Sequence, residues 1–265
     1  MVFIGTTYLE NLLYLHNFTV MPAVQSNVHF LARDSVYEKE KPNTLRYPSE
    51  DDLPQTNFRV EKHEDITFHD IRGQESSFSY EKNGFTIAHL DSKMAYTDFA
   101  NSEMIKNVFL KEVSTMLQSV LEATTVQALE YIIRKRHCTF PISTGQTYHY
   151  NQPTSVAHID STPSCTTATV KNRNGENASE FLQQRYQCVN IWKPLKGPLR
   201  DWPLGLCDPT TVEADSDLRA ADIVYSEYVV ENYQVHFTPE QKWYYLDNQL
   251  PSEVIVFRQS DSDMR

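Results

Sequence analysis

The sequence predicts a mainly β domain with some α-helix: a double-stranded β-helix of the jelly-roll or cupin-like kind, with a long helix flanking it. Two observations support this fold class. Short apolar runs of strand length, separated by turn-forming residues, fill the chain after residue 150. Residues 101–121 have the spacing of an amphipathic helix. A chain of 265 residues can bury a full core, so we expect a single domain over residues 1–265.

Residues 1–100 are expected to form an N-terminal extension with hairpins, wrapped on the core. Residues 27–34 alternate apolar and polar side chains, as an edge strand does. Residues 37–57 are charged and rich in proline, which indicates a long surface loop. Residues 63–90 contain short alternating runs, and Asn83-Gly84 among them is a hairpin-turn signal.

The helix is predicted at 101–122 and the jelly-roll core at 123–265. Ser102 is a candidate N-cap for the helix. Residues 125–140 fit either a strand or a continued helix. The later runs 155–160, 185–192, 221–237, 242–247 and 252–257 are typical of strands. Turn signals such as Lys196-Gly197-Pro198 and Asp208-Pro209 separate them, which favours an antiparallel barrel or jelly roll.

The composition excludes several classes of protein. A net charge of −11 without any Lys/Arg-rich run argues against nucleic acid as a partner. None of the seven glycines stands in a nucleotide-binding loop motif. The first 25 residues have no basic leader and no apolar run long enough for a membrane span. The four cysteines lack C-x-x-C spacing, so we expect reduced thiols, a cytoplasmic location and no membrane partner.

A His-x-Asp pattern that suits a metal site occurs three times. Residues two apart on a strand point to the same side, so such a pair can supply two of the three ligands of a facial iron site. The three pairs are His63/Asp65, His89/Asp91 and His158/Asp160. The third begins the strand-rich region, which singles it out as the metal candidate. The alternative is a hydrogen-bonded histidine beside an aspartate at a strand end.

Two long runs in the second half carry an ordered pattern. They are RYQCVNIWKPLKGPLRDWPLGLCD (185–208) and QKWYYLDNQLPSEVIVFRQSDS (241–262). With D-I-R-G and N-G-F upstream, they resemble the CmcJ/AsaB-like hydroxylase/desaturase family over residues 28–262. That resemblance implies a fungal-type Fe(II)/2-oxoglutarate-dependent oxygenase of secondary metabolism with a jelly-roll core.

Carried over residue by residue, the resemblance makes His158 and Asp160 iron ligands. It places Arg185, Asn190 and Trp192 near the cosubstrate or substrate pocket. Lys193 stands there too, where many members have arginine, which weakens bidentate binding of a carboxylate.

The family's P-H-T-A-F segment, whose histidine resembles the distal iron ligand, does not occur in this sequence. His236 is the candidate replacement. We therefore expect a non-catalytic or partner-dependent oxygenase subunit. Its expected partner is a homologous oxygenase, in a heterodimer, or a second copy of itself. The alternative is an oxygenase that is competent on its own. Both use Fe(II) and 2-oxoglutarate, and both imply a small natural product as substrate.

Overall fold

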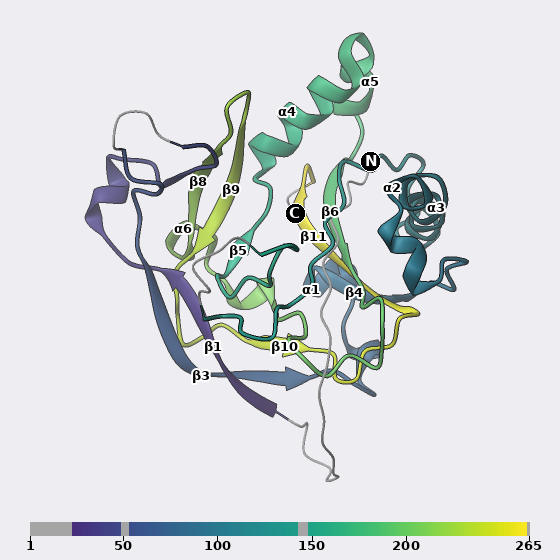
Figure 1. Cartoon of the computed structure of the whole chain (residues 1–265). Helices are drawn as coiled ribbons and strands as arrows, with labels where there is room; N and C mark the ends of the chain where they lie inside the picture. Colours follow the sequence, from purple (N-terminus) through teal and green to yellow (C-terminus); the bar gives the residue numbers. More distant parts are fainter. Residues whose placement is uncertain (1–22, 49–52, 143–147, 264–265) are drawn as a thin grey trace.

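The computed structural model describes residues 23–48, 53–142 and 148–263 (Figure 1). Its strands are β1 (Ala23–Leu31), β2 (Asn43–Leu45), β3 (Val60–Asp70), β4 (Phe85–His89), β5 (His158–Ile159), β6 (Gln187–Trp192), β7 (Leu206–Cys207), β8 (Leu218–Val224), β9 (Val229–Val235), β10 (Trp243–Tyr245) and β11 (Glu253–Asp261). Its α-helices are α1 (Tyr80–Asn83), α2 (Ser102–Met104), α3 (Leu110–Val120), α4 (Pro163–Asn174), α5 (Ala178–Leu182) and α6 (Ala214–Asp217).

Three sheets surround the centre of the molecule (Figure 1). The first, the β1 sheet, has the strand order β1-β3-β10-β7; the second, the β11 sheet, has the order β4-β11-β6; the third, the β9 sheet, has the order β2-β8-β9-β5. Neighbouring strands are antiparallel except for β3 with β10 and β2 with β8. The described strands form open sheets rather than a closed barrel. Sheet with a few helices is the predicted composition.

The described part of residues 1–100 contributes strands to all three sheets. Strand β3 pairs with β10, and β4 pairs with β11 over Phe85–Phe257 to His89–Glu253. Both partners lie near the other end of the chain. The sheets therefore need strands from both halves of the chain. Pairing across such a distance in sequence is not visible in the local pattern of either half.

The helical segment after residue 100 covers the outer face of the β11 sheet. Asn101, rather than the predicted Ser102, caps its start by accepting hydrogen bonds from the backbone N–H groups of Glu103 and Met104. A π-helical turn, Ile105–Phe109, joins α2 to α3. The apolar face of this helical segment packs on alternate residues of β6 and β11. The cluster includes Ile105, Phe109, Val113, Leu117, Val189, Ile191, Val254 and Val256.

Two local predictions are corrected. Asn83-Gly84 ends the short helix α1 instead of forming a hairpin turn. Gly84 has a φ of 71°, and its N–H donates to the Tyr80 carbonyl at 3.0 Å, the left-handed geometry that glycine adopts after a helix. Residues 125–137 form neither strand nor helix apart from one bridge between Arg134 and Asn151. No helix in the described ranges has the length and apolarity that a bilayer crossing requires.

Lys193 is buried on the helix-covered face of the β11 sheet. Its side chain continues the row of Val189 and Ile191, and the residue is 3% exposed. The ammonium nitrogen lies 5.6 Å from the ring centroid of Phe99 and 5.5 Å from that of Phe109. Burial lowers the pKa of Lys193 to about 8, against the opposing charge of Glu112.

Replacing Lys193 by methionine is expected to stabilise the fold at neutral pH. The lysine pKa is about 8 in the folded chain, against an ordinary value of 10.5, so the unfolded chain binds more protons between those values. The free energy of unfolding of the wild type therefore rises with pH across this window. Below it, the penalty is on the order of 3 kcal/mol. Urea unfolding of both proteins should show an advantage of the Lys193→Met variant that shrinks as the pH approaches about 10. An advantage independent of pH would contradict this reading.

Candidate metal and cosubstrate site

His158 is held by its own strand so that one ring nitrogen stays available. The Nδ1 atom lies 2.7 Å from the Val156 carbonyl oxygen, to which Nδ1–H donates. That hydrogen bond fixes the tautomer and leaves Nε2 as the free atom. Nε2 faces the Asp160 carboxylate, with 3.2 Å between Nε2 and Oδ1. The pair thus presents one nitrogen and one oxygen to the same point.

Asp160 is positioned by two other strands. Asn190 of β6 donates from Nδ2 to Oδ2 of Asp160 at 2.5 Å. The backbone N–H of Asp160 donates to Oε1 of Gln259, in β11, at 2.6 Å. The carboxylate is therefore fixed at the junction of the β9 sheet with the β11 sheet. Asn190 was predicted as a pocket residue, whereas Gln259 was missed because no local motif marks it.

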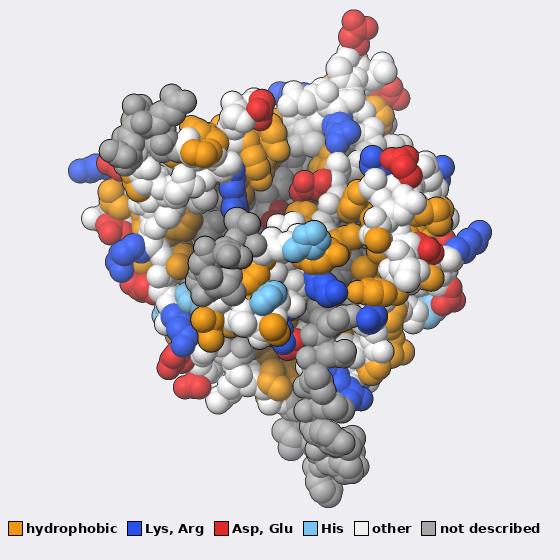
Figure 2. Space-filling model, viewed as in Figure 1, with side chains coloured by type: hydrophobic (Ala, Val, Ile, Leu, Met, Phe, Trp, Pro, Cys, Tyr) orange, Lys and Arg blue, Asp and Glu red, His pale blue; other side chains and the backbone are white. Residues whose placement is uncertain are grey.

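The pair is partly exposed to solvent, although many protein atoms surround it. The side chains of His158 and Asp160 are 29% and 51% exposed, although burial is the largest influence on both pKa values. Burial alone would lower the pKa of His158, but the Asp160 charge outweighs it and raises that pKa. Burial would raise the pKa of Asp160, but His158 and Asn190 hold it below its usual value. Figure 2 shows a face of the molecule that is hollowed near its centre.

These two residues fit a divalent metal. Two ligand atoms about 2.1 Å from a metal and at right angles to each other are about 3 Å apart, close to the observed 3.2 Å between Nε2 and Oδ1. A histidine anchored through Nδ1 and a carboxylate held by an amide are the arrangement in which outer hydrogen bonds orient metal ligands. His158 and Asp160 would therefore hold Fe(II).

His236 does not join this pair. Its Nδ1 lies 2.8 Å from the Leu31 carbonyl oxygen, and its backbone N–H donates to the Asp217 carbonyl. Burial lowers the pKa of His236, so the ring is neutral and tied to the end of β1. Among the residues that the structure describes, no three His, Cys, Asp or Glu side chains gather as a metal site. The structure thus gives the prediction for His236 no support.

The other predicted pocket residues make contacts away from the His158/Asp160 pair. Arg185 donates to both carboxylate oxygens of Asp261, at 3.1 and 2.6 Å, and reaches Glu81 at 3.2 Å. Trp192 is 2% exposed within an apolar cluster. Lys193 lies on the far face of the sheet, over the Phe99 and Phe109 rings. These three residues support the fold and do not line the His158/Asp160 pair.

The two early His-x-Asp pairs lie elsewhere. His63 stacks on Phe237, with ring centroids 4.1 Å apart. His89 and Asp91 contact each other at 3.0 Å, with side chains 64% and 85% exposed. The second pair is an ordinary surface contact, and it gives a matched control for experiments on the third.

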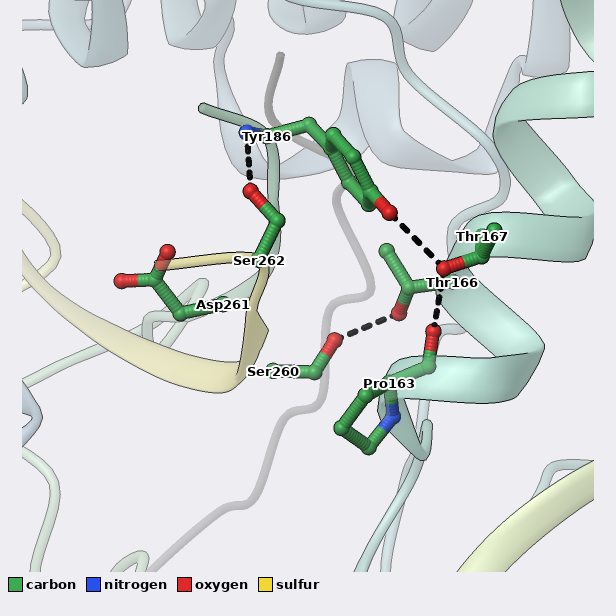
Figure 3. A pocket seen from close by; sticks show the side chains of 7 residues that line it. All are labelled: Pro163, Thr166, Thr167, Tyr186, Ser260, Asp261 and Ser262. Carbon is green, nitrogen blue, oxygen red and sulfur yellow. Dashed lines mark hydrogen bonds between the residues drawn. The ribbon is translucent and has the colours of Figure 1, made fainter. Parts of the chain in front are cut away.

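Hydroxyl groups fasten α4, which follows Asp160, to the end of β11 and to the residue before β6 (Figure 3). Thr166 and Ser260 share a hydrogen bond of 2.5 Å, and Thr167 and Tyr186 share one of 2.8 Å. Thr162 caps α4 by accepting from the N–H of Cys165. The small pocket here is lined by groups that hydrogen-bond to one another. These contacts hold the start of α4 in place and so set the position of the residues just before it.

Charged groups lie within electrostatic reach of the pair. Burial raises the pKa of Glu130, and the negative charge of Asp160 adds to this effect. Burial lowers the pKa of Arg134, and Asp160 opposes the change. Arg134 also donates to the Gln152 carbonyl at 2.5 Å. Residues 125–137 therefore contribute polar walls near the pair although they form no regular element.

Curated relatives of this chain are fungal oxygenases. It is 29% identical over 217 residues to the Fe(II)/2-oxoglutarate-dependent dioxygenase nvfI of Aspergillus novofumigatus, covering 79% of this chain and 74% of the relative. It is 25% identical over 217 residues to the hydroxylase/desaturase efuI of Hormonema carpetanum, covering 75% and 72%. The dioxygenase tstK of Talaromyces stipitatus is 28% identical over 204 residues, with coverage of 75% and 72%.

The fold is similar to a solved oxygenase. The iron and alpha-ketoglutarate-dependent endoperoxidase NvfI matches with a TM-score of 0.78 and 26% identity, over 91% of this chain and 86% of that one. This likeness confirms the predicted jelly-roll class. The family model described as oxidoreductase/YMDC permease-like domain matches residues 28–265. The chain therefore belongs to that oxidoreductase family, and its homologues are fungal Fe(II)/2-oxoglutarate-dependent dioxygenases and hydroxylase/desaturases.

Proposed function

We propose that this chain is an Fe(II)/2-oxoglutarate-dependent oxygenase that binds Fe(II) through Nε2 of His158 and a carboxylate oxygen of Asp160. The observation that carries the proposal is the 3.2 Å approach of these two anchored atoms. Bound Fe(II) and 2-oxoglutarate supply the activation of O₂ for oxidation of an organic substrate. Oxygenase relatives from fungal secondary metabolism support a small natural product as that substrate.

The residues of this chain perform the positioning. The Val156 carbonyl oxygen accepts a hydrogen bond from Nδ1–H of His158 and keeps Nε2 aimed at the metal position. Asn190 restrains one Asp160 oxygen and leaves the other facing His158. Both side chains are partly exposed, so ligands dissolved in the solvent can reach the pair.

A second candidate is a non-catalytic or partner-dependent subunit, paired with a homologous oxygenase. It is favoured by the position of His236, which is turned to the Leu31 carbonyl and leaves the described pair with two protein ligands. In this case the third metal position is filled by solvent or by another chain. Two protein ligands hold Fe(II) more weakly than three, so a partner would strengthen binding.

Replacing His158 by alanine should weaken Fe(II) binding by more than the 10–100-fold typical of losing an outer hydrogen bond, because a ligand atom itself is removed. An anaerobic metal titration of the purified chain measures this. The control is His89→Ala, which breaks the same sequence motif at the exposed pair. Equal metal affinity of the two variants would reject the proposed metal site.

Replacing Asn190 by leucine should lower Fe(II) affinity about 10-fold. The substitution keeps the side chain's size but removes the 2.5 Å hydrogen bond that orients Asp160. The same titration measures the change, and circular dichroism verifies that the β11 sheet is intact. An unchanged affinity with an intact fold would mean that Asp160 is not oriented by Asn190.

Decarboxylation of 2-oxoglutarate separates the two candidates. A competent oxygenase consumes 2-oxoglutarate as the purified chain alone with Fe(II). A partner-dependent subunit does so only after a homologous oxygenase is added, and the mixture elutes as a larger species. Activity of the isolated chain would rule out the subunit role. If activity needs the added oxygenase, His158→Ala in the reconstituted complex shows which chain holds the reacting iron.

A further inference from the structure

The β8–β9 hairpin ends in two stacked tyrosine rings, and it projects away from the centre of the molecule (Figure 1). Tyr225 and Tyr228 form the last pair of its ladder, since the Tyr225 N–H donates to the Tyr228 carbonyl at 2.9 Å. The ring centroids are 4.6 Å apart and the ring planes are inclined by 21°. Such cross-strand pairs stabilise a hairpin. Tyr228 is nevertheless 57% exposed, so the outer ring is open to solvent.

The stacked rings lie on the same face of the β9 sheet as His158. In the two ladders that β9 forms, His158 and Arg219 both stand opposite Gln234. Residues directly opposite in a ladder share one face, and so do residues an even number apart on a strand. Tyr228 lies six residues before Gln234, and Tyr225 lies six residues after Arg219. The row from His158 through Gln234 to Arg219 and the tyrosine pair are therefore on one face, about 20 Å apart along the strands.

This face passes from the core to the surface toward the hairpin tip. Asn232 and Ala221 form the pair nearest the row, and they are 3% and 2% exposed. Val230 and Ile223 form the next pair and are half-buried. Tyr228 follows, with the exposed ring. A ligand can therefore lie on the tip without displacing core side chains, and the pair that it meets on the way to the core is apolar.

Arg46 is the cationic neighbour of the stack. Strand β2 runs parallel to β8 with Leu45 opposite Val224, and the Arg46 N–H donates to the Val224 carbonyl at 2.8 Å. Burial raises the pKa of Tyr225, and the positive charge of Arg46 opposes that rise. Arg46 is exposed, and no carboxylate pairs with it among the residues that the structure describes. In a chain with a net charge of −11, this arginine is available to an anionic group of a ligand.

Glu130 relates the hairpin tip to the metal pair. Burial, and to a smaller extent the charge of Asp160, raises the pKa of Glu130. Besides burial, the negative charge of Glu130 also raises the pKa of Tyr225. One carboxylate is thus within electrostatic reach of both Asp160 and the tyrosine stack. An elongated molecule can therefore rest on the stack with one end and reach the pair with the other.

We propose that Tyr228 and Arg46 bind the end of the substrate remote from its reacting carbon, and that this end is a planar ring bearing a carboxylate. The inference rests on the proposed function for the place of the reacting carbon at the His158/Asp160 pair. The exposed tyrosine ring offers a face for stacking on another planar ring. The guanidinium donates two parallel hydrogen bonds to a carboxylate. The hairpin tip thereby selects the substrate and takes no part in its oxidation.

Calorimetric titration of the full chain with three probes tests the binding site without any metal. The first is 2-naphthoate, which is planar and anionic. The second, 2-naphthamide, has the same rings without the charge, and the third, decahydro-2-naphthoate, has the same charge without planar rings. The wild type should bind 2-naphthoate about 2- to 5-fold more tightly than the amide and about 3- to 10-fold more tightly than the saturated acid. Added salt should weaken binding of 2-naphthoate and leave that of the amide unchanged, because salt screens the attraction to an exposed arginine.

Two variants assign the two preferences to their residues. Tyr228→Leu keeps an apolar side chain at the tip and should lose the preference over the saturated acid. Arg46→Gln should lose the preference over the amide, together with the effect of salt. A merely structural role in the hairpin would change the melting temperature of these variants and leave both ratios of affinities as they are in the wild type.

Tyr96→Leu and Arg59→Gln are the matched controls. Tyr96 is 39% exposed, but the Lys196 ammonium lies over its ring, 4.2 Å from the centroid. The side chain of Arg59 is 69% exposed and pairs with Glu61 at 3.7 Å. Both controls should show the preferences of the wild type. Two results overturn the proposal: a wild type that binds the three probes equally, or test variants that retain both preferences. A Tyr228→Leu variant that breaks up an oligomer without changing probe binding would assign the ring to a contact between chains instead.

Proton NMR of 2-naphthoate relates the bound ring to the metal pair. Mn(II) is paramagnetic, so at the pair it should broaden the probe's signals, whereas Mg(II) should not. His158→Ala should remove the broadening and keep the affinity for the probe, and His89→Ala should retain the broadening. A wild type that binds Mn(II) through His158 without broadening the probe would refute the substrate role of the tip and leave the oxygenase proposal standing. A wild type that binds neither Mn(II) nor Fe(II), yet keeps both preferences, would refute the oxygenase proposal and leave a binding site for ring carboxylates.

Discussion

The ladder that places β11 between β4 and β6 is the contact on which the site depends. Val254, Ile255 and Val256 in this strand are completely buried, and the strand pairs along both edges. One face supports the helix α3, and the other faces the centre of the molecule. The same strand supplies Gln259, which fixes the backbone of Asp160. A shift of β11 would therefore move the His158/Asp160 pair and the helix together.

Two kinds of interaction hold the surroundings of the pair. One hydroxyl pair, Thr166 with Ser260, fastens α4 to the end of β11, and a second, Thr167 with Tyr186, fastens α4 to the residue before β6. A bidentate ion pair joins Arg185 to Asp261, one residue after Ser260. The hydroxyl contacts are uncharged and close to His158 and Asp160, whereas the ion pair is partly exposed. Screening by salt weakens the second kind of contact more than the first. Added salt should therefore weaken the Arg185–Asp261 contact more than the hydroxyl contacts near the His158/Asp160 pair.

The local pattern predicted the strands well, because β6, β9 and β11 combine apolar residues with turn signals on either side. It also predicted the His158/Asp160 pair, since residues two apart share a strand face. It failed where structure depends on partners distant in sequence. Strand β3 looked peripheral until its pairing with β10 was known. The row from His158 through Gln234 to Arg219 depends on the registers of two ladders, which no single segment reveals.

Lys193 shows an error that the sequence could have prevented. Asn190 and Lys193 are three apart on one strand, so they point to opposite faces. Asn190 reaches Asp160, and Lys193 accordingly lies among the helix-facing residues. Asn83-Gly84 shows a different limit. The Asn-Gly dipeptide indicates a left-handed backbone conformation, which occurs in hairpin turns and at helix ends alike.

The pairing of early strands with late ones determines when the molecule can fold. Strand β4 finds β11 only after residue 253 has been made, and β3 finds β10 only after residue 243. At ribosomal speeds this delay is on the order of ten seconds. During that time α3 has no sheet on which to bury its apolar face. The apolar face of α3 and the edge of β4 therefore lack their native partners until β11 has been made.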